Sequence, residues 1–168
     1  MKWGLIPFWV KDPKIGSRMI NARAETVVER PIFREVFSKR RCLVLADGFY
    51  EWQKTPEGKV PMRIVLKLGE PFGFAGLWAT WKSADGQSVN SCTIITTTAN
   101  SLMEPIHNRM PVILTRETES SWLDQKAESS ELRALLVPYP ANEMDAYEVS
   151  TLVNSPKNDS LEVIARLA

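Results

Sequence analysis

The residues best suited to proton transfer are His107, the chain's single histidine, and Glu51. An imidazole titrates near neutral pH, so His107 can take or give a proton under physiological conditions. Glu51 lies between Tyr50 and Trp52, after an apolar run. Partial desolvation in such a place raises a carboxyl pKa and suits general acid/base work. The two residues therefore predict an acid/base site.

Each of these residues also has a structural interpretation. A lone histidine is often a structural residue with satisfied hydrogen bonds, and Glu51 could lie on the outer face of an edge strand. Asn108 and Arg109, which follow His107 directly, favour a functional segment, because apolar neighbours can anchor it while its polar groups face outward. For Glu51 the pattern leaves both interpretations open.

A second polar group could hold an anion. Asn21 and Arg23 are two residues apart, so in an extended segment both side chains point to one side and could bind a phosphate or a sugar oxygen. Thr96 could present a hydroxyl near them, and Trp9 could stack on a nucleobase. Each of these features has an alternative. Asn21 and Arg23 could lie in a loop held by an Arg23–Glu25 pair, and the threonine run could be an ordinary strand. The tryptophans, which include Trp3, Trp9, Trp78 and Trp81, could be core residues.

Size and composition indicate a soluble globular protein. The chain has 168 residues, of which 44% are apolar and 24% charged, and we expect one domain over 1–168. No apolar run approaches the ~20 residues that cross a bilayer, and no signal pattern begins the chain, so we expect a cytoplasmic protein. Cys42 and Cys92 are expected to be reduced core residues. With one histidine, neither a zinc site nor a cofactor is expected.

Charge is unevenly distributed along the chain. The first 41 residues carry ten Lys/Arg and four Asp/Glu, whereas the remainder carries eleven and sixteen. One interpretation is a solvated surface of uneven charge. The other is a basic face that attracts a phosphate backbone.

The hydrophobic pattern predicts an α+β domain with a barrel-like, mostly antiparallel sheet and short peripheral helices. A helix is expected over 31–38, where a proline precedes an apolar face, and others are expected to start at Asn100, Thr115 and Ser130. The run 3–9 (WGLIPFW) predicts a buried extended segment. Strands are expected at 42–46, 49–53, 62–68, 72–81, 91–98, 111–114 and 147–153.

Seven motifs in order resemble the SOS response-associated peptidase (SRAP) family, whose members process abasic sites in single-stranded DNA. The resemblance covers nearly the whole chain, and seven motifs in sequence are far more specific than one. The motifs are WGLIPFW at 3–9, NARAET at 21–26, CLVLADGFYEW at 42–52, FAGLW at 74–78, TTTAN at 96–100, IHNRMP at 106–111 and VNSPKND at 153–159.

The resemblance implies a mechanism and assigns residues to it. In this family the amine and thiol of an N-terminal cysteine condense with the ring-opened aldehyde of the abasic site and close a thiazolidine. By the matching motifs, Asn21 positions the N-terminal residue and the sugar, Glu51 is the acid/base, and His107 is the imidazole of β-elimination-type or reversal steps. Arg23 and Arg109 would contact phosphates. For members that carry this cysteine, the resemblance implies crosslinking and lyase-type activity in the DNA damage response.

The beginning of the sequence departs from the family pattern. Met1 and Lys2 lead directly into the WGLIPFW run, and neither Cys42 nor Cys92 carries the α-amine that a thiazolidine needs. The resemblance therefore suggests an N-terminally truncated SRAP domain without crosslinking. We expect a monomer, with self-association if an apolar patch is left exposed. The alternatives are a non-catalytic single-stranded-DNA-binding remnant and, more weakly, a small hydrolase that uses His107 and Glu51.

Overall fold

The computed structural model describes residues 1–167, and the chain clusters into two compact units. Unit 1 comprises residues 1–45, 73–97 and 111–138. Unit 2 comprises residues 46–72, 98–110 and the residues from 139 onward. Each unit is therefore built from segments that are distant in the sequence.

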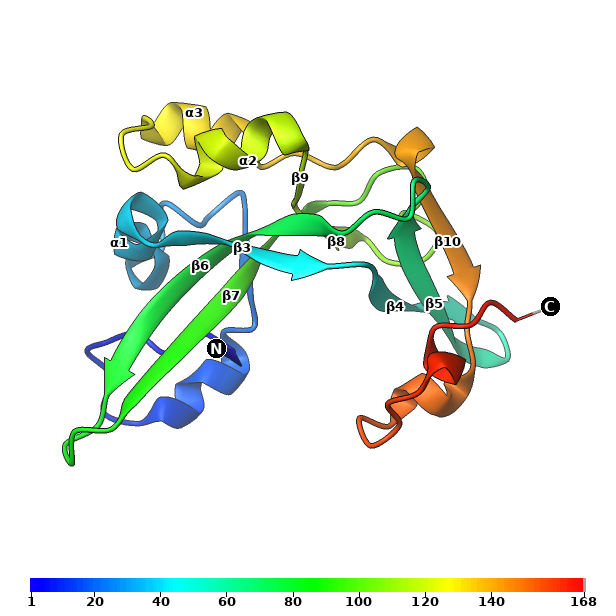
Figure 1. Cartoon of the computed structure of the whole chain (residues 1–168), viewed down its shortest axis with the longest axis horizontal. Coiled ribbons are helices and arrows are strands. Elements are labelled where there is room, and N and C mark those ends of the chain that lie inside the picture. The colour runs from blue at the N-terminus through cyan, green and yellow to red at the C-terminus, as the bar shows by residue number, and fades with distance from the viewer. Residues whose placement is uncertain (168) are drawn as a thin grey trace. The chain divides into compact units, whose positions relative to one another are not determined.

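The larger of two sheets belongs mostly to unit 1. Its order is β1-β7-β6-β3, with β2 and β8 also paired to β7, and β9 to β6. The pairings β6–β7 and β6–β9 are antiparallel, whereas β1 and β2 run parallel to β7. Figure 1 shows β6 and β7 as one long hairpin. The strands are β1 (Lys2–Trp3), β2 (Asn21–Arg23), β3 (Arg41–Ala46), β6 (Phe72–Lys82), β7 (Ser88–Thr98), β8 (Arg109–Pro111) and β9 (Ile113–Leu114).

Three α-helices and a short 3-10 helix complete unit 1. Helix α1 (Pro31–Lys39) buries Phe33, Val36 and Phe37 in the unit's apolar core, as the sequence pattern predicts. Helices α2 (Arg116–Leu123) and α3 (Ser129–Ala134) add Trp122 and Leu132 to the same core. The 3-10 helix η1 (Pro13–Arg18) begins with an Asp12 side-chain cap.

Unit 2 is built on a three-stranded antiparallel sheet of order β10-β5-β4, made of β4 (Phe49–Thr55), β5 (Gly58–Leu66) and β10 (Met144–Glu148). The 3-10 helix η2 (Ala141–Glu143) directly precedes β10, and two others, η3 (Thr151–Asn154) and η4 (Leu161–Val163), follow it. The Tyr147 hydroxyl donates to the carbonyl oxygen of Ile164, and η4 lies beside β10 in Figure 1. The fully buried core side chains of this unit include Ile64, Met103, Met110 and Met144.

The structure confirms the α+β class, with open sheets rather than a closed barrel. The helix expected after Asn100 is wrong: residues 101–106 form consecutive hydrogen-bonded turns. Pro105 explains the difference, because proline lacks an N–H and disfavours helical backbone in the residue before it. The last strand is β10 at 144–148, earlier than the expected 147–153.

The prediction that residues 3–9 are buried is half right. Gly4, Leu5, Ile6 and Pro7 are buried, but Trp3, Phe8 and Trp9 are more than half exposed. Gly4 has φ 109°, and a Cβ there would lie 2.4 Å from the Gly16 carbonyl oxygen. This close backbone contact requires glycine, and the segment turns between buried and exposed positions instead of running straight.

Candidate active site in unit 2 and candidate anion-binding strand in unit 1

Strand β4 carries Glu51 at its third residue, opposite Met62 of β5. The side chain is 28% exposed. Alternation along the strand puts Glu51 and Gln53 on one face and Tyr50 and Trp52 on the other. Tyr50 donates to the Val163 carbonyl oxygen and Trp52 to Asn154 Oδ1. The aromatic neighbours of Glu51 are thus held against the C-terminal segment, and the carboxylate lies on the opposite face of the sheet.

His107 follows a tight turn that is anchored by buried apolar side chains. Met103 is fully buried and Ile106 is 8% exposed, whereas the His107 side chain is 45% exposed. The Met103 carbonyl oxygen accepts from the backbone N–H groups of both Ile106 and His107, at 2.8 Å each. Apolar side chains therefore anchor the turn and leave the imidazole at the surface, as the sequence suggested.

The structure brings Glu51 and His107 together within unit 2. Glu51 Oε1 lies 4.0 Å from His107 Nδ1. The same Nδ1 accepts from the Arg109 backbone N–H at 3.2 Å and lies 3.1 Å from the Arg109 carbonyl oxygen. A neutral ring can accept from the N–H, and a ring protonated at Nδ1 can donate to the carbonyl oxygen. One backbone residue thus accommodates both protonation states.

The environment of Glu51 favours its protonated form. Burial raises the pKa of the Glu51 carboxyl group, and a protonated His107 and a backbone hydrogen bond oppose the rise. A carboxyl group with a raised pKa is a better proton donor near neutral pH than an ordinary glutamate. Glu51 is therefore partly desolvated as predicted, although Tyr50 and Trp52, from which the prediction was made, lie on the other face of the strand; the His107 imidazole lies beside the carboxyl group.

In unit 1, Asn21 and Arg23 project from β2 with their side chains exposed, and Ala22 between them is buried. Strand β2 pairs parallel to β7, with Asn21 opposite Ile94 and Arg23 opposite Thr96. The alternation confirms that the amide and the guanidinium share one exposed face. Thr96 is half-buried, and its hydroxyl lies 3.4 Å from the Ala22 carbonyl oxygen.

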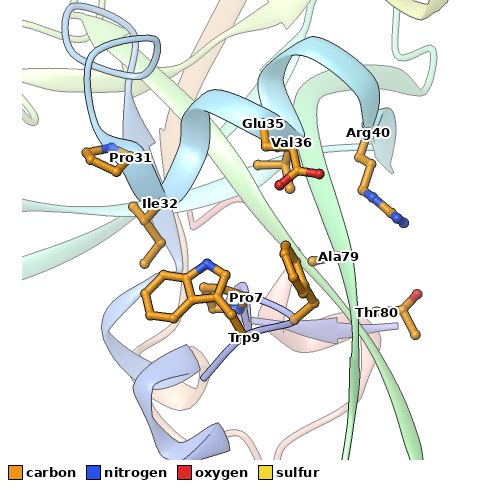
Figure 2. A pocket seen from close by; sticks show the side chains of 10 residues that line it. Pro7, Trp9, Pro31, Ile32, Glu35, Val36, Arg40, Ala79 and Thr80 are labelled. Atoms are coloured by element: carbon orange, nitrogen blue, oxygen red, sulfur yellow. The ribbon is translucent and has the colours of Figure 1, made fainter. Parts of the chain in front are cut away.

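Trp9 lies elsewhere in unit 1, at a small pocket (Figure 2). Trp9 is 60% exposed, and Trp3 is 55% exposed. A core role for these two rings is therefore excluded, and stacking on a base remains open to them. The pocket is lined by Pro7, Phe8 and Trp9, by Pro31, Ile32, Glu35, Val36 and Arg40 at helix α1, and by Ala79 and Thr80 of β6.

The predicted site residues thus fall into two sets. Unit 2 holds Glu51 and His107 together, with the Arg109 backbone at the imidazole. Unit 1 holds the remaining predicted residues, which are Asn21, Arg23, Thr96 and Trp9. The structure shows no group of three or more His, Cys, Asp or Glu that could hold a metal among residues 1–167. In the same range, no helix has the length and apolar character to cross a membrane.

Two polar residues near His107 were missed as site residues. Asn100 Oδ1 accepts from the Met103 backbone N–H at 3.0 Å, inside the turn. Gln53 Nε2 donates to the Pro105 carbonyl oxygen at 3.2 Å, from the strand that carries Glu51. The signal for Gln53 was its spacing of two from Glu51, which places it on the same face of a strand. Its contact with Pro105 is tertiary, so no local pattern reveals it.

Fold and site together define an α+β protein with a carboxyl–imidazole pair on one unit and an exposed amide–guanidinium pair on the other. The family model for SOS response associated peptidase (SRAP) matches residues 1–156. The chain belongs to the SRAP family.

Named relatives and a solved structure agree with this family. The chain is 55% identical over 166 residues to the abasic site processing protein YoqW of Bacillus subtilis, a match that covers 98% of this chain and 74% of YoqW. It is 33% identical over 190 residues to the abasic site processing protein HMCES of Xenopus tropicalis, covering 99% of this chain and 56% of HMCES. A crystal structure of a Bacteroides thetaiotaomicron protein superposes with a TM-score of 0.91 at 37% identity, covering 98% of this chain and 75% of that one.

Proposed function

We propose that this chain processes abasic sites in single-stranded DNA, with Glu51 and His107 as the proton-transfer pair. The observation that carries the proposal is the 4.0 Å approach of a partly desolvated carboxyl group to the chain's one imidazole. Relatives named as abasic site processing proteins support the choice of substrate.

The chemistry of an abasic site requires such a pair. An amine that attacks the open-chain aldehyde gives a carbinolamine, which must lose water to become an imine. Proton donation to the departing hydroxyl group is the role proposed for Glu51, whose raised pKa keeps more of it protonated. His107 accepts a proton from the amine during attack, or from the sugar carbon next to the imine in a β-elimination that cleaves the strand.

The nucleophile is a separate question from proton transfer. The family resemblance implies the amine and thiol of an N-terminal cysteine. Cys42 and Cys92, the two cysteines of the sequence, lie within strands β3 and β7 and have no α-amine. Proton transfer by Glu51 and His107 does not depend on which molecule supplies the amine and thiol, so it can be tested with a nucleophile that is added.

DNA binding is assigned to polar and aromatic side chains that are exposed or half-buried. We propose that Arg23 and Arg109 contact phosphates, that Asn21 holds the sugar or the nucleophile, and that Thr96 and Trp9 assist by a hydroxyl contact and by base stacking. The excess of basic residues among the first 41 supports a role for unit 1 in backbone binding. Binding through phosphates weakens as salt concentration rises and is insensitive to base sequence.

The test uses a single-stranded oligonucleotide with one abasic site, with free L-cysteine as the added amine and thiol. Mass spectrometry follows the thiazolidine product, and denaturing gels follow covalent protein–DNA adducts and strand cleavage. We expect the protein to accelerate thiazolidine formation, and Glu51→Gln and His107→Ala to lower that acceleration by about 100-fold, the usual size of one general acid/base contribution. Retardation gels should show unchanged DNA affinity in both variants.

Arg23→Ala is the matched binding variant. It should weaken DNA binding at every base sequence and make binding less sensitive to salt. Salt-sensitive binding without any acceleration would refute proton transfer and leave the non-catalytic DNA-binding alternative. No DNA affinity at low salt would refute both. A covalent adduct without added cysteine would show that a residue of this chain is itself a nucleophile.

A further inference from the structure

Strand β4 reaches the His107 turn at two points. Glu51 Oε1 lies 4.0 Å from His107 Nδ1, and Gln53 Nε2 donates to the Pro105 carbonyl oxygen at 3.2 Å. The two side chains leave the strand on the same face because they are two residues apart. Strand β4 therefore presents both the carboxylate that faces the imidazole and an amide that holds the backbone at Pro105, two residues before His107.

We propose that Gln53 is a positioning residue, whose hydrogen bond to Pro105 holds the 100–107 turn so that His107 stays within reach of Glu51. The proposal rests on the proposed function of that pair. It extends that function by naming the residue that sets the geometry of the pair without itself touching the substrate.

The contacts of the Pro105–Ile106 peptide group support this role. Its carbonyl oxygen accepts from Gln53, and its N–H, which belongs to Ile106, donates to the Met103 carbonyl oxygen at 2.8 Å. The plane of this peptide is thus fixed from both ends. The Ile106–His107 peptide group follows, and its N–H also donates to the Met103 carbonyl oxygen at 2.8 Å, so the two held peptide planes together set the direction in which the imidazole leaves the backbone.

Packing alone does not fix this part of the turn. Pro105, His107 and Asn108 are all exposed, and of residues 103–108 only Met103 and Ile106 are buried. Asn100 shapes the beginning of the turn through its bond to the Met103 N–H. Its Nδ2 donates to the Tyr139 carbonyl oxygen at 2.7 Å and so ties the turn to the segment before β10, whereas the Gln53 bond joins the turn to β4. Gln53 is therefore a hydrogen-bonded link, beside the Glu51–His107 approach itself, that relates the position of the turn to the strand that carries Glu51.

The test exploits the fact that His107 is the chain's one histidine, so its ring gives the single set of imidazole NMR signals. In the wild-type chain we expect these signals to respond to the ionisation of Glu51, with Glu51→Gln as the reference that removes the response. Gln53→Met keeps the length of the side chain and removes the donor, and it should weaken the response. Lys54→Met, the matched control on the other face of β4, should leave it unchanged.

The processing assay provides a second measurement. Gln53→Met should slow thiazolidine formation by about 10-fold or more without loss of DNA affinity, because a misplacement on the order of 1 Å costs up to about 100-fold. Gln53→Lys, which restores a donor, should recover part of the rate. Gln53→Leu replaces Gln53→Met in both measurements if the latter does not fold.

The two proposals fail in different ways. An NMR response in Gln53→Met equal to that of the wild type overturns the positioning role, whatever the activity. A wild-type chain without any response overturns it too, because the pair is then not held together. A response that weakens in Gln53→Met, in a chain that never accelerates the abasic-site reaction, supports positioning and refutes the proposed function.

Discussion

Replacing Arg41 by methionine should destabilise unit 1 strongly, although Arg41 lies outside the proposed site. Its side chain is 4% exposed, and it donates to the Trp122 carbonyl oxygen at 2.7 Å and to that of Phe37 at 2.8 Å. Two further bonds, each 2.5 Å long, reach the carbonyl oxygens of Ser38 and Asp124. One guanidinium thus donates to carbonyl oxygens at the C-terminal ends of both α1 and α2. The last carbonyls of a helix have no partners within the helix, so they need such a donor.

The magnitude follows from the two acceptors that are buried. Each buried carbonyl left without a donor costs about 1–3 kcal/mol, so the Phe37 and Trp122 oxygens together cost about 2–6 kcal/mol. Removing the buried cation offsets part of this, since burial already lowers the pKa of Arg41. We therefore expect a loss of about 3 kcal/mol. With a urea dependence of about 2 kcal/mol per molar, the midpoint falls by about 1.5 M.

Urea unfolding followed by tryptophan fluorescence measures this shift, and Arg40→Met is the matched control. Arg40 is the neighbouring residue, is half-buried, and lies over the Trp78 ring at 4.9 Å from its centroid. Such a contact is worth about 0.5–1 kcal/mol, so the control should shift the midpoint by less than about 0.5 M. Equal midpoints for the two variants would refute the reasoning, because they would show that the Arg41 hydrogen bonds contribute no more than a surface contact.

Two other predictions use the directions of the pKa shifts. Because burial raises the folded-state pKa of Glu51, the unfolded chain loses this proton more readily, and stability should fall as pH rises from the ordinary pKa of 4.5 through the raised pKa. The urea midpoint of Glu51→Gln should therefore exceed that of the wild type above this pH range and match it below. A midpoint difference that does not change with pH would contradict the raised pKa. Burial raises the pKa of Cys42 to about 11 from 9.0, so its alkylation by iodoacetamide in the folded chain at pH 8 should be about 100-fold slower than in urea, and equal rates would contradict this.

The sequence was most informative where local chemistry decides. Proline at the start of α1 with apolar residues on one face predicted that helix within one residue, and β-branched and aromatic runs predicted β6 and β7. The spacing of Asn21 and Arg23 predicted their common face, which β2 presents. These features depend on alternation and helical periodicity, which are properties of adjacent residues.

The tertiary structure alone decided how distant segments meet. The sequence separates Glu51 from His107 by 56 positions, and no local pattern indicates that their side chains approach to 4.0 Å. The same is true of Gln53 at Pro105 and of Arg41 at Trp122. The sequence by itself determined which groups can transfer protons and bind anions. Which of them lie together depends on long-range strand pairing and burial, because a side chain's partners are set by the whole fold and not by its neighbours in the chain.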